Sequence, residues 1–170
     1  MPLDRPYRSF SLLLKYIKYF VKAKNIHSAH SPFLFDLFSN ILQNKRLKDP
    51  SIENQRELYF NSKEIVQFEE NGAGSRIEKT NQRSLSKLAK SSLMNFKYQS
   101  VLINIINHYK LSYGLELGTS LGITTSYLAK NLTNELHTIE ADPTIYAKSE
   151  HMFKILSIDN VKCWLGTFDR

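Results

Sequence analysis

The sequence predicts an α/β fold in which a helical N-terminal extension precedes a short parallel sheet. Three apolar segments have the length of strands and alternate with two helical patterns, in the order strand near 113–117, helix near 122–131, strand near 136–140, helix near 143–157 and strand near 161–165. Such alternation is typical of a parallel sheet with helices packed on its faces. We therefore expect a partial Rossmann-like sheet in residues 61–170 and the helical extension in residues 1–60.

The N-terminal part contains two predicted helices. Residues 9–24 have an amphipathic pattern, with most apolar residues on one side and a stripe of three lysines on the other: Lys15, Lys18 and Lys22. Ser31 is a suitable N-cap for a second helix, and Pro32 suits its first turn. Asp49-Pro50 is expected to end this region, so that residues 49–63 form a polar connector.

The middle of the chain is expected to contain one short strand and one long helical region. Ile65 to Phe68 is apolar enough for a strand, and the polar residues after it form a turn that includes Gly72-Ala73-Gly74-Ser75. A helical pattern resumes at about Ser84 and ends near Lys110.

Composition restricts the class of protein. With 170 residues, 42% of them apolar, the chain has the size of about one globular domain. It contains no run of 18 apolar residues and no pattern of a signal peptide, so we expect a cytoplasmic protein without a transmembrane segment. The single cysteine, Cys163, excludes an intramolecular disulfide and is expected to be a buried packing residue.

The net charge of +7 is unevenly distributed along the chain. Residues 1–48 hold nine Lys and Arg against two acids, whereas residues 111–170 hold five against seven. The basic front could meet an anionic partner such as nucleic acid or a membrane surface. A solvated lysine face is the favoured interpretation, because lysine is a common surface residue.

The turn after the first strand of the series has the features of an anion- or nucleotide-binding site. Gly118 lacks a side chain, so a ligand can approach its backbone closely, and Gly122 lets the next helix pack tightly against its strand. The start of that helix offers unpaired N–H groups to an anion. Hydroxyl donors are added by three residues of the turn and helix: Thr119, Ser120 and Thr124.

A second acid supports a nucleotide ligand. Glu140 ends the strand near 136–140 and lies 22 residues after Gly118, near the ~20 expected for a carboxylate that binds a ribose. The glycine spacing differs from a dinucleotide fingerprint, because Ser120 stands where the middle glycine is expected. A P-loop is excluded, because no Gly-Lys-Ser/Thr follows.

These motifs resemble those of a known enzyme family. The segment from Glu116 to Gly122 is similar to motif I of class I S-adenosylmethionine-dependent methyltransferases, in the variant of the catechol O-methyltransferase-like branch, and 136–142 looks like motif II. Two further segments are similar to a bacterial group of these enzymes: Lys22 to Asp36, and Gly72-Ala73-Gly74-Ser75. The resemblance implies S-adenosylmethionine as cofactor and methyl transfer as the reaction.

The resemblance also implies a role for each matching residue. Glu116 and the Gly118 backbone would lie against the methionine end of the cofactor, while Ser120 and Thr124 would hold its carboxylate and amine region. Glu140 would bind the ribose. The adenine would be flanked by three residues that follow the second and third strands of the series: Ala141, Thr167 and Phe168.

The chain also departs from the family pattern. Members usually continue for several more strands, which carry an acidic residue near the methyl group and any metal ligands, so we expect a chain truncated after its third strand. No general base, metal ligand or methyl acceptor is assigned. The alternative is an inactive remnant that acts as an interaction module, as a homo-oligomer or as a basic polyanion-binding module; nucleic acid is the less favoured partner.

Three other features have simpler interpretations. His27 and His30 have a spacing that would suit a metal on a helix, but no third ligand lies nearby in the sequence, so capping or structural roles are favoured. Asp142 precedes Pro143 and is expected to cap the next helix. A dehydrogenase is disfavoured by Ser120 at the middle glycine position.

Overall fold

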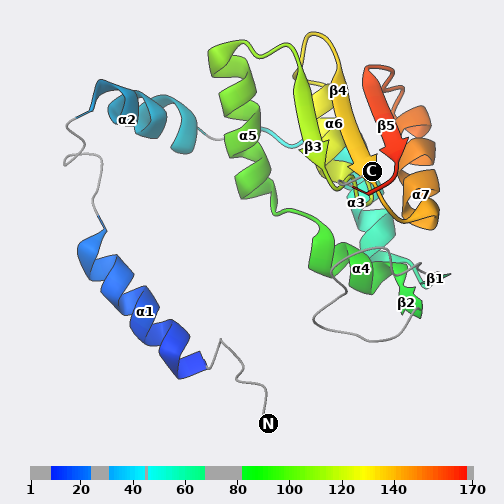
Figure 1. Ribbon diagram of the computed structural model, residues 1–170, viewed down its shortest axis with the longest axis horizontal. Helices are drawn as coiled ribbons and strands as arrows, with labels where there is room; N and C mark the ends of the chain where they lie inside the picture. The colour runs from blue at the N-terminus through cyan, green and yellow to red at the C-terminus, as the bar shows by residue number, and fades with distance from the viewer. Residues whose placement is uncertain (1–8, 24–30, 45, 68–81, 168–170) are drawn as a thin grey trace. The chain divides into compact units, whose positions relative to one another are not determined.

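A computed structural model describes four ranges of the chain, residues 9–23, 31–44, 46–67 and 82–167 (Figure 1). The chain divides into two compact units, Met1–Ser39 and Asn40–Arg170. The second unit contains the sheet.

The first unit contains the two predicted N-terminal helices. Helix α1 spans Ser9–Lys22 and α2 spans Pro32–Asp36, with the π-helix η2 continuing the chain over Leu37–Leu42. The predicted cap is confirmed, since the Leu34 N–H donates to Ser31 Oγ at 3.5 Å. Within the ranges described, no helix is long and apolar enough to cross a membrane.

The expectation of a polar connector over 49–63 is wrong, because helix α3 occupies Pro50–Asn61. Asp49 and Pro50 begin a helix instead of ending one. Asp49 Oδ1 accepts the N–H groups of Ser51 at 2.9 Å and Ile52 at 3.2 Å, and the fixed φ of proline suits the first helical position. The weak periodicity of α3 has a simple reason: only Ile52 and Arg56 are fully buried in it.

A small hairpin follows α3. Strand β1, Ile65–Gln67, pairs antiparallel with β2, Gln82–Ser84. The predicted strand at Ile65 is therefore confirmed, and β2 is an addition that sequence periodicity did not indicate.

Two helices occupy the region where one long helix was expected. Helix α4 spans Leu85–Ser92 and α5 spans Phe96–Tyr109. The break occurs because Asn95 caps α5, accepting the Lys97 N–H at 2.9 Å in an extended backbone conformation. Capping by asparagine ends the continuous helical pattern without any proline or glycine.

The predicted parallel sheet is present. Its elements are β3 Gly114–Leu117, α6 Ile123–Ala129, β4 Leu136–Glu140, α7 Pro143–Ile155 and β5 Val161–Leu165. All three strands are parallel, in the order β3-β4-β5. The α/β class with a partial Rossmann-like sheet is thus confirmed.

Helices α6 and α7 cover one face of this sheet (Figure 1). Residues that face them alternate with residues that do not, as the strand period of two requires. One core cluster joins α6 and α7 to α3 and α5 and consists of six buried residues of these helices: Ile52, Ile103, Ile123, Tyr127, Met152 and Phe153.

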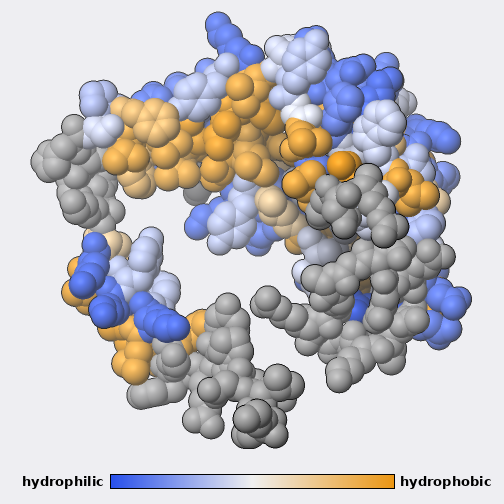
Figure 2. Space-filling model, in the orientation of Figure 1, coloured by the Kyte–Doolittle hydropathy of each residue, from blue (hydrophilic) through white to orange (hydrophobic). Residues whose placement is uncertain are grey.

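The opposite face of the sheet is exposed and largely apolar. Leu117 pairs in register with Ile139, and Ile139 with Trp164, so these side chains share one face. Leu115, Leu117 and Trp164 are 68%, 60% and 57% exposed. Hydrophobic residues also gather over the neighbouring α5 (Figure 2). Exposed apolar surface of this kind marks a contact site more often than a solvent face.

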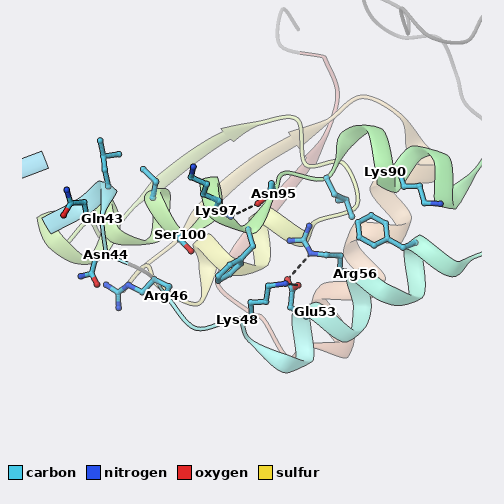
Figure 3. A pocket seen from close by; sticks show the side chains of 15 residues that line it. Gln43, Asn44, Arg46, Lys48, Glu53, Arg56, Lys90, Asn95, Lys97 and Ser100 are labelled. Atoms are coloured by element: carbon cyan, nitrogen blue, oxygen red, sulfur yellow. Dashed lines mark hydrogen bonds and ion pairs between the residues drawn. The ribbon is translucent and has the colours of Figure 1, made fainter. Parts of the chain in front are cut away.

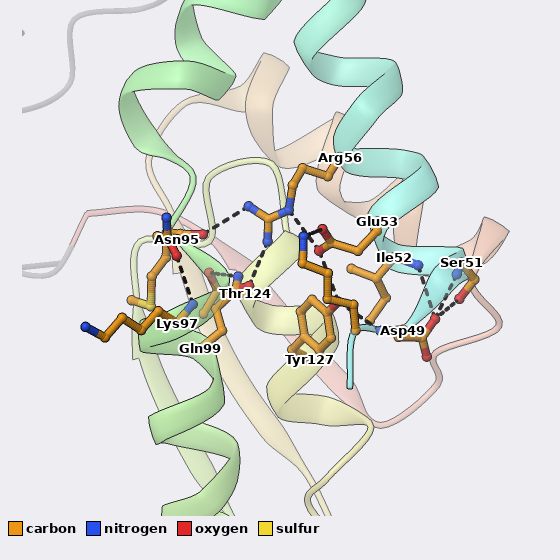
Figure 4. Close-up of polar contacts among 12 residues, drawn as sticks. Asp49, Ser51, Ile52, Glu53, Arg56, Asn95, Lys97, Gln99, Thr124 and Tyr127 are labelled. Carbon is orange, nitrogen blue, oxygen red and sulfur yellow. Dashed lines mark hydrogen bonds and ion pairs between the residues drawn. The ribbon is translucent and has the colours of Figure 1, made fainter. Parts of the chain in front are cut away.

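A network of polar contacts joins α3 to α5 and α6 (Figure 4). Arg56 is 7% exposed, and its guanidinium donates to Glu53 Oε1 at 3.0 Å, to the Met94 carbonyl at 3.0 Å and to Gln99 Oε1 at 2.7 Å. Gln99 in turn donates to Thr124 Oγ1 at 3.0 Å. The first turn of α6 is thereby tied to α3 through two side chains.

Asp49 caps α3 and also holds α6. Its carboxylate accepts from Lys130 Nζ at 2.8 Å. Burial would raise the Asp49 pKa, but the hydrogen bonds from Lys130, Ser51 and the Ile52 N–H lower it to about 2. A carboxyl group with a lowered pKa stabilises the folded state above its unfolded pKa, and this contribution is lost as the pH falls through the folded value.

We expect Asp49→Ala to lower the free energy of unfolding by about 1 kcal/mol at neutral pH, because the cap is removed. Urea denaturation followed by circular dichroism measures this change. The difference from wild type should shrink as the pH falls from the ordinary Asp pKa of 3.8 to about 2. Glu57→Ala, an exposed acid on the same helix, is the control and should change stability by under about 0.5 kcal/mol. A difference that grows in acid would contradict the assignment.

Candidate functional site

The predicted turn lies at the carboxyl ends of β3 and β4, where open α/β sheets bind ligands. The N–H groups of Gly118 and Thr119 both donate to the Ile139 carbonyl, at 3.0 and 3.2 Å. These bonds continue the β3–β4 pairing into the turn. The turn therefore has a fixed position beside the end of β4.

The two glycines of the turn have different surroundings. Gly118 has φ +96°, and a Cβ atom there would meet nothing within 4 Å, so the space above it is open. Gly122 has φ +76°, and a Cβ atom there would lie 2.8 Å from Met152 Cε and 2.9 Å from Phe153 Cε1. Gly118 is thus the point where a ligand can approach the backbone, whereas Gly122 permits close packing of α6 against α7.

Ser120 adopts a left-handed conformation, with φ +50°. This is uncommon for a residue with a side chain, and it matches the position where the sequence lacks the expected middle glycine. The Ser120 N–H donates to Glu140 Oε2 at 2.8 Å, and its hydroxyl donates to Ser92 Oγ at 3.0 Å. Both contacts support the conformation of the turn.

Glu140 lies directly against this turn. Its Oε2 accepts the Ser120 N–H, and its Oε1 accepts the Asp142 N–H at 3.1 Å. Each carboxylate oxygen can accept a second hydrogen bond. The carboxylate is therefore fixed by the backbone and still has acceptor capacity for two hydroxyl groups.

Glu116 faces the covered side of the sheet. Its Oε2 accepts from the hydroxyls of Thr125 at 2.6 Å and Thr138 at 3.0 Å. Burial raises the pKa of Glu116, and these two hydrogen bonds oppose the increase. As placed, the carboxylate joins β3, β4 and α6, and its expected contact with the methionine end of a cofactor stays a prediction.

The predicted hydroxyl donors contact other protein groups. Thr119 is 3% exposed, and its Oγ1 lies 2.7 Å from Thr138 Oγ1, while Thr124 Oγ1 accepts from Gln99. Ser92 and Gln99, which contact Ser120 and Thr124, were not predicted as site residues. No local signal identifies them, because they come from α4 and α5 and meet the turn only in the folded chain.

The residues after β4 and β5 lie near each other. The Gly166 N–H donates to the Glu140 carbonyl at 2.9 Å, so the chain leaving β5 begins beside the end of β4. Ala141 and Thr167, which follow these two residues, are both partly exposed. Phe168 lies outside the described residues. The same is true of Gly72-Ala73-Gly74-Ser75 and of the histidines at 27 and 30.

The simpler interpretations of two residues fit the structure. Asp142 caps α7, since its Oδ1 accepts the N–H groups of Thr144 at 2.8 Å and Ile145 at 2.9 Å. Cys163 is partly buried, and burial raises its pKa, so the thiol form is favoured. Within the part of the chain that is described, no group of three or more His, Cys, Asp or Glu could hold a metal ion.

Solved structures share this fold. A methyltransferase from Podospora anserina with bound SAH (S-adenosylhomocysteine) is 16% identical, with a TM-score of 0.53 over 85% of this chain and 53% of that one. An O-methyltransferase from Bacillus cereus in complex with SAH is 15% identical, with a TM-score of 0.50 over 84% of this chain and 52% of that one. This chain therefore spans about half the length of these proteins. No family model matches the sequence, and no curated protein matches it.

The contrast between the two glycines can be measured. Gly122→Ala should lower the free energy of unfolding by about 3 kcal/mol, because the methyl group overlaps Met152 and Phe153 and the left-handed backbone disfavours alanine. Gly118→Ala carries only the backbone penalty, about 1 kcal/mol, since the space around it is open. Equal losses in guanidinium denaturation would contradict the different surroundings of the two positions.

Proposed function

We propose that this chain binds S-adenosylmethionine at the β3–β4 turn and serves methyl transfer from that cofactor to an acceptor. The observation that carries the proposal is the position of Glu140. Its carboxylate is held against the glycine turn by two backbone N–H groups and keeps acceptor capacity on both oxygens. A ribose presents two adjacent hydroxyl groups, which match two carboxylate oxygens.

The open space above Gly118 supports the same ligand. A nucleoside whose ribose is bound by Glu140 needs backbone without side chains beside it, and Gly118 provides this in a conformation that favours glycine. Ala141 follows Glu140 and is small, which leaves room for an adenine ring. Solved proteins with the same fold hold SAH, which makes this cofactor the natural candidate among nucleoside ligands.

The bound cofactor would supply an activated methyl group on a sulfonium. The part of the protein would then be to hold the two reactants in line and to exclude water from between them. Rigid support suits this role. Thr119 is buried, Ser120 is bonded to Glu140 and Ser92, and Gln99 holds Thr124.

A second candidate function is protein–protein interaction through the exposed face of the sheet. Leu115, Leu117 and Trp164 share that face and are each more than half exposed. Such a surface favours association with another polypeptide. Gel filtration at several protein concentrations tests it: a monomer at every concentration would argue against self-association through this face.

The cofactor proposal is tested by calorimetric titration with S-adenosylhomocysteine. We expect saturable one-to-one binding by the 170-residue chain. Glu140→Ala should weaken it by roughly tenfold to a hundredfold, the value of about one hydrogen bond to a charged group.

The matched control is Glu57→Ala, which removes an exposed acid from α3 and should leave the affinity unchanged. Circular dichroism establishes that each variant is folded. Equal affinity of wild type and Glu140→Ala would refute the role of Glu140, and the absence of binding by folded wild type would refute a cofactor pocket in this chain.

A further inference from the structure

One cavity of the sheet-containing unit lies away from the glycine turn. It is a groove of about 910 Å³ bounded by the chain before α3, the helix α3 itself and the junction of α4 with α5 (Figure 3). This volume lies within the range of ligand pockets, roughly 300–1,000 Å³. We call it the basic groove, and its lining includes five cationic residues: Arg46, Lys48, Arg56, Lys90 and Lys97.

The charges of the basic groove are not balanced. Glu53 is the one acidic residue of its lining. Glu53 accepts from Arg56 and pairs with Lys48 at 3.0 Å, and these cations hold its pKa below the ordinary value although burial would raise it. The carboxylate is therefore already engaged. It does not offset the three remaining cations, Arg46, Lys90 and Lys97.

These three cations are accessible. All three residues are exposed. The side chains of Lys90 and Lys97 make no hydrogen bond or ion pair with the described part of the chain, and the guanidinium of Arg46 is bonded there through Nε only, to Asn104 Oδ1 at 2.6 Å. Figure 3 places Arg46 and Lys90 towards opposite ends of the groove, with Lys97 between them. Positive charge is thus spread along the groove.

The groove also has apolar walls. Phe60, Leu93 and Phe96 line it, and each is partly buried. Lys48 Nζ lies 5.6 Å from the centre of the Phe96 ring, so charge and aromatic surface are adjacent. A ligand that uses both must carry anionic groups and an apolar or flat group in one molecule.

We infer that the basic groove binds an organic phosphate, a small molecule in which one or more phosphate groups are joined to a flat or apolar group. Phosphate oxygens accept strong hydrogen bonds from lysine and arginine, and several cations in one groove suit a chain of phosphates better than one carboxylate. The volume of the groove is in the range of small-molecule pockets, which favours a small molecule over a polymer. This inference does not depend on the cofactor proposal, because none of the groove residues belongs to the glycine turn.

The test uses uridine triphosphate, inorganic triphosphate and uridine in calorimetric titrations of the full chain with S-adenosylhomocysteine present in excess. The excess keeps the probes from any nucleoside site at the turn. We expect saturable binding of uridine triphosphate, weaker binding of inorganic triphosphate and none of uridine. Binding should weaken as salt is added, because exposed charges are screened.

The double variant Lys90→Gln/Lys97→Gln should bind uridine triphosphate at least about tenfold more weakly, since two charge-assisted hydrogen bonds are lost. The matched control is Lys63→Gln/Lys154→Gln, which removes the same charge from exposed positions outside the groove and should bind as wild type does. Circular dichroism shows that both variants fold.

Three outcomes would overturn the inference. The first is failure of folded wild type to bind either triphosphate, and the second is equal affinity of the groove variant and its control. The third comes from single-stranded oligonucleotides as competitors. If they displace uridine triphosphate with an affinity that rises with their length, the occupant is a nucleic-acid strand and not a small organic phosphate.

Discussion

The arrangement of the helices around the sheet depends on the buried guanidinium of Arg56. A charge in the interior is costly unless it is paired and hydrogen-bonded. Arg56 meets this requirement with three partners from three places: Glu53 in α3, the Met94 carbonyl before α5, and Gln99 in α5. Moving any one of these elements would leave a buried charge unsatisfied, so the elements keep one relative position.

The same contacts connect the two candidate sites and give them different character. Gln99, which accepts from Arg56, donates to Thr124 in the first turn of α6, beside the glycine turn. On the other side, Glu53 balances Arg56 and leaves Arg46, Lys90 and Lys97 as the uncompensated charge of the basic groove. The glycine turn is thus rigid and offers a carboxylate, whereas the groove offers cations. The carboxylate suits the hydroxyl groups of a ligand, and the cations suit its anionic groups.

The parts of the structure that sequence predicted correctly depend on local rules. The strand–helix alternation after residue 113 follows from short-range periodicity, and Ser31 and Asp142 cap the helices expected of them. The errors have a local cause as well. Asp49-Pro50 was interpreted as the end of a helix, although an aspartate N-cap before a proline favours a helix start. Helix α3 has weak periodicity because a hydrogen-bonded arginine, Arg56, stands at a buried position.

The sequence by itself determined the class of fold and the glycine turn with its acid, because strand period, glycine conformation and capping act over a few residues. It placed Glu140 at the end of a strand, which is where the carboxylate lies. Only the tertiary structure decided that Glu140 is fixed by the Ser120 N–H and that Glu116 turns towards Thr125 and Thr138. It alone assembled the basic groove. These contacts join residues that lie far apart in the chain, and packing, which no local pattern encodes, brings them together.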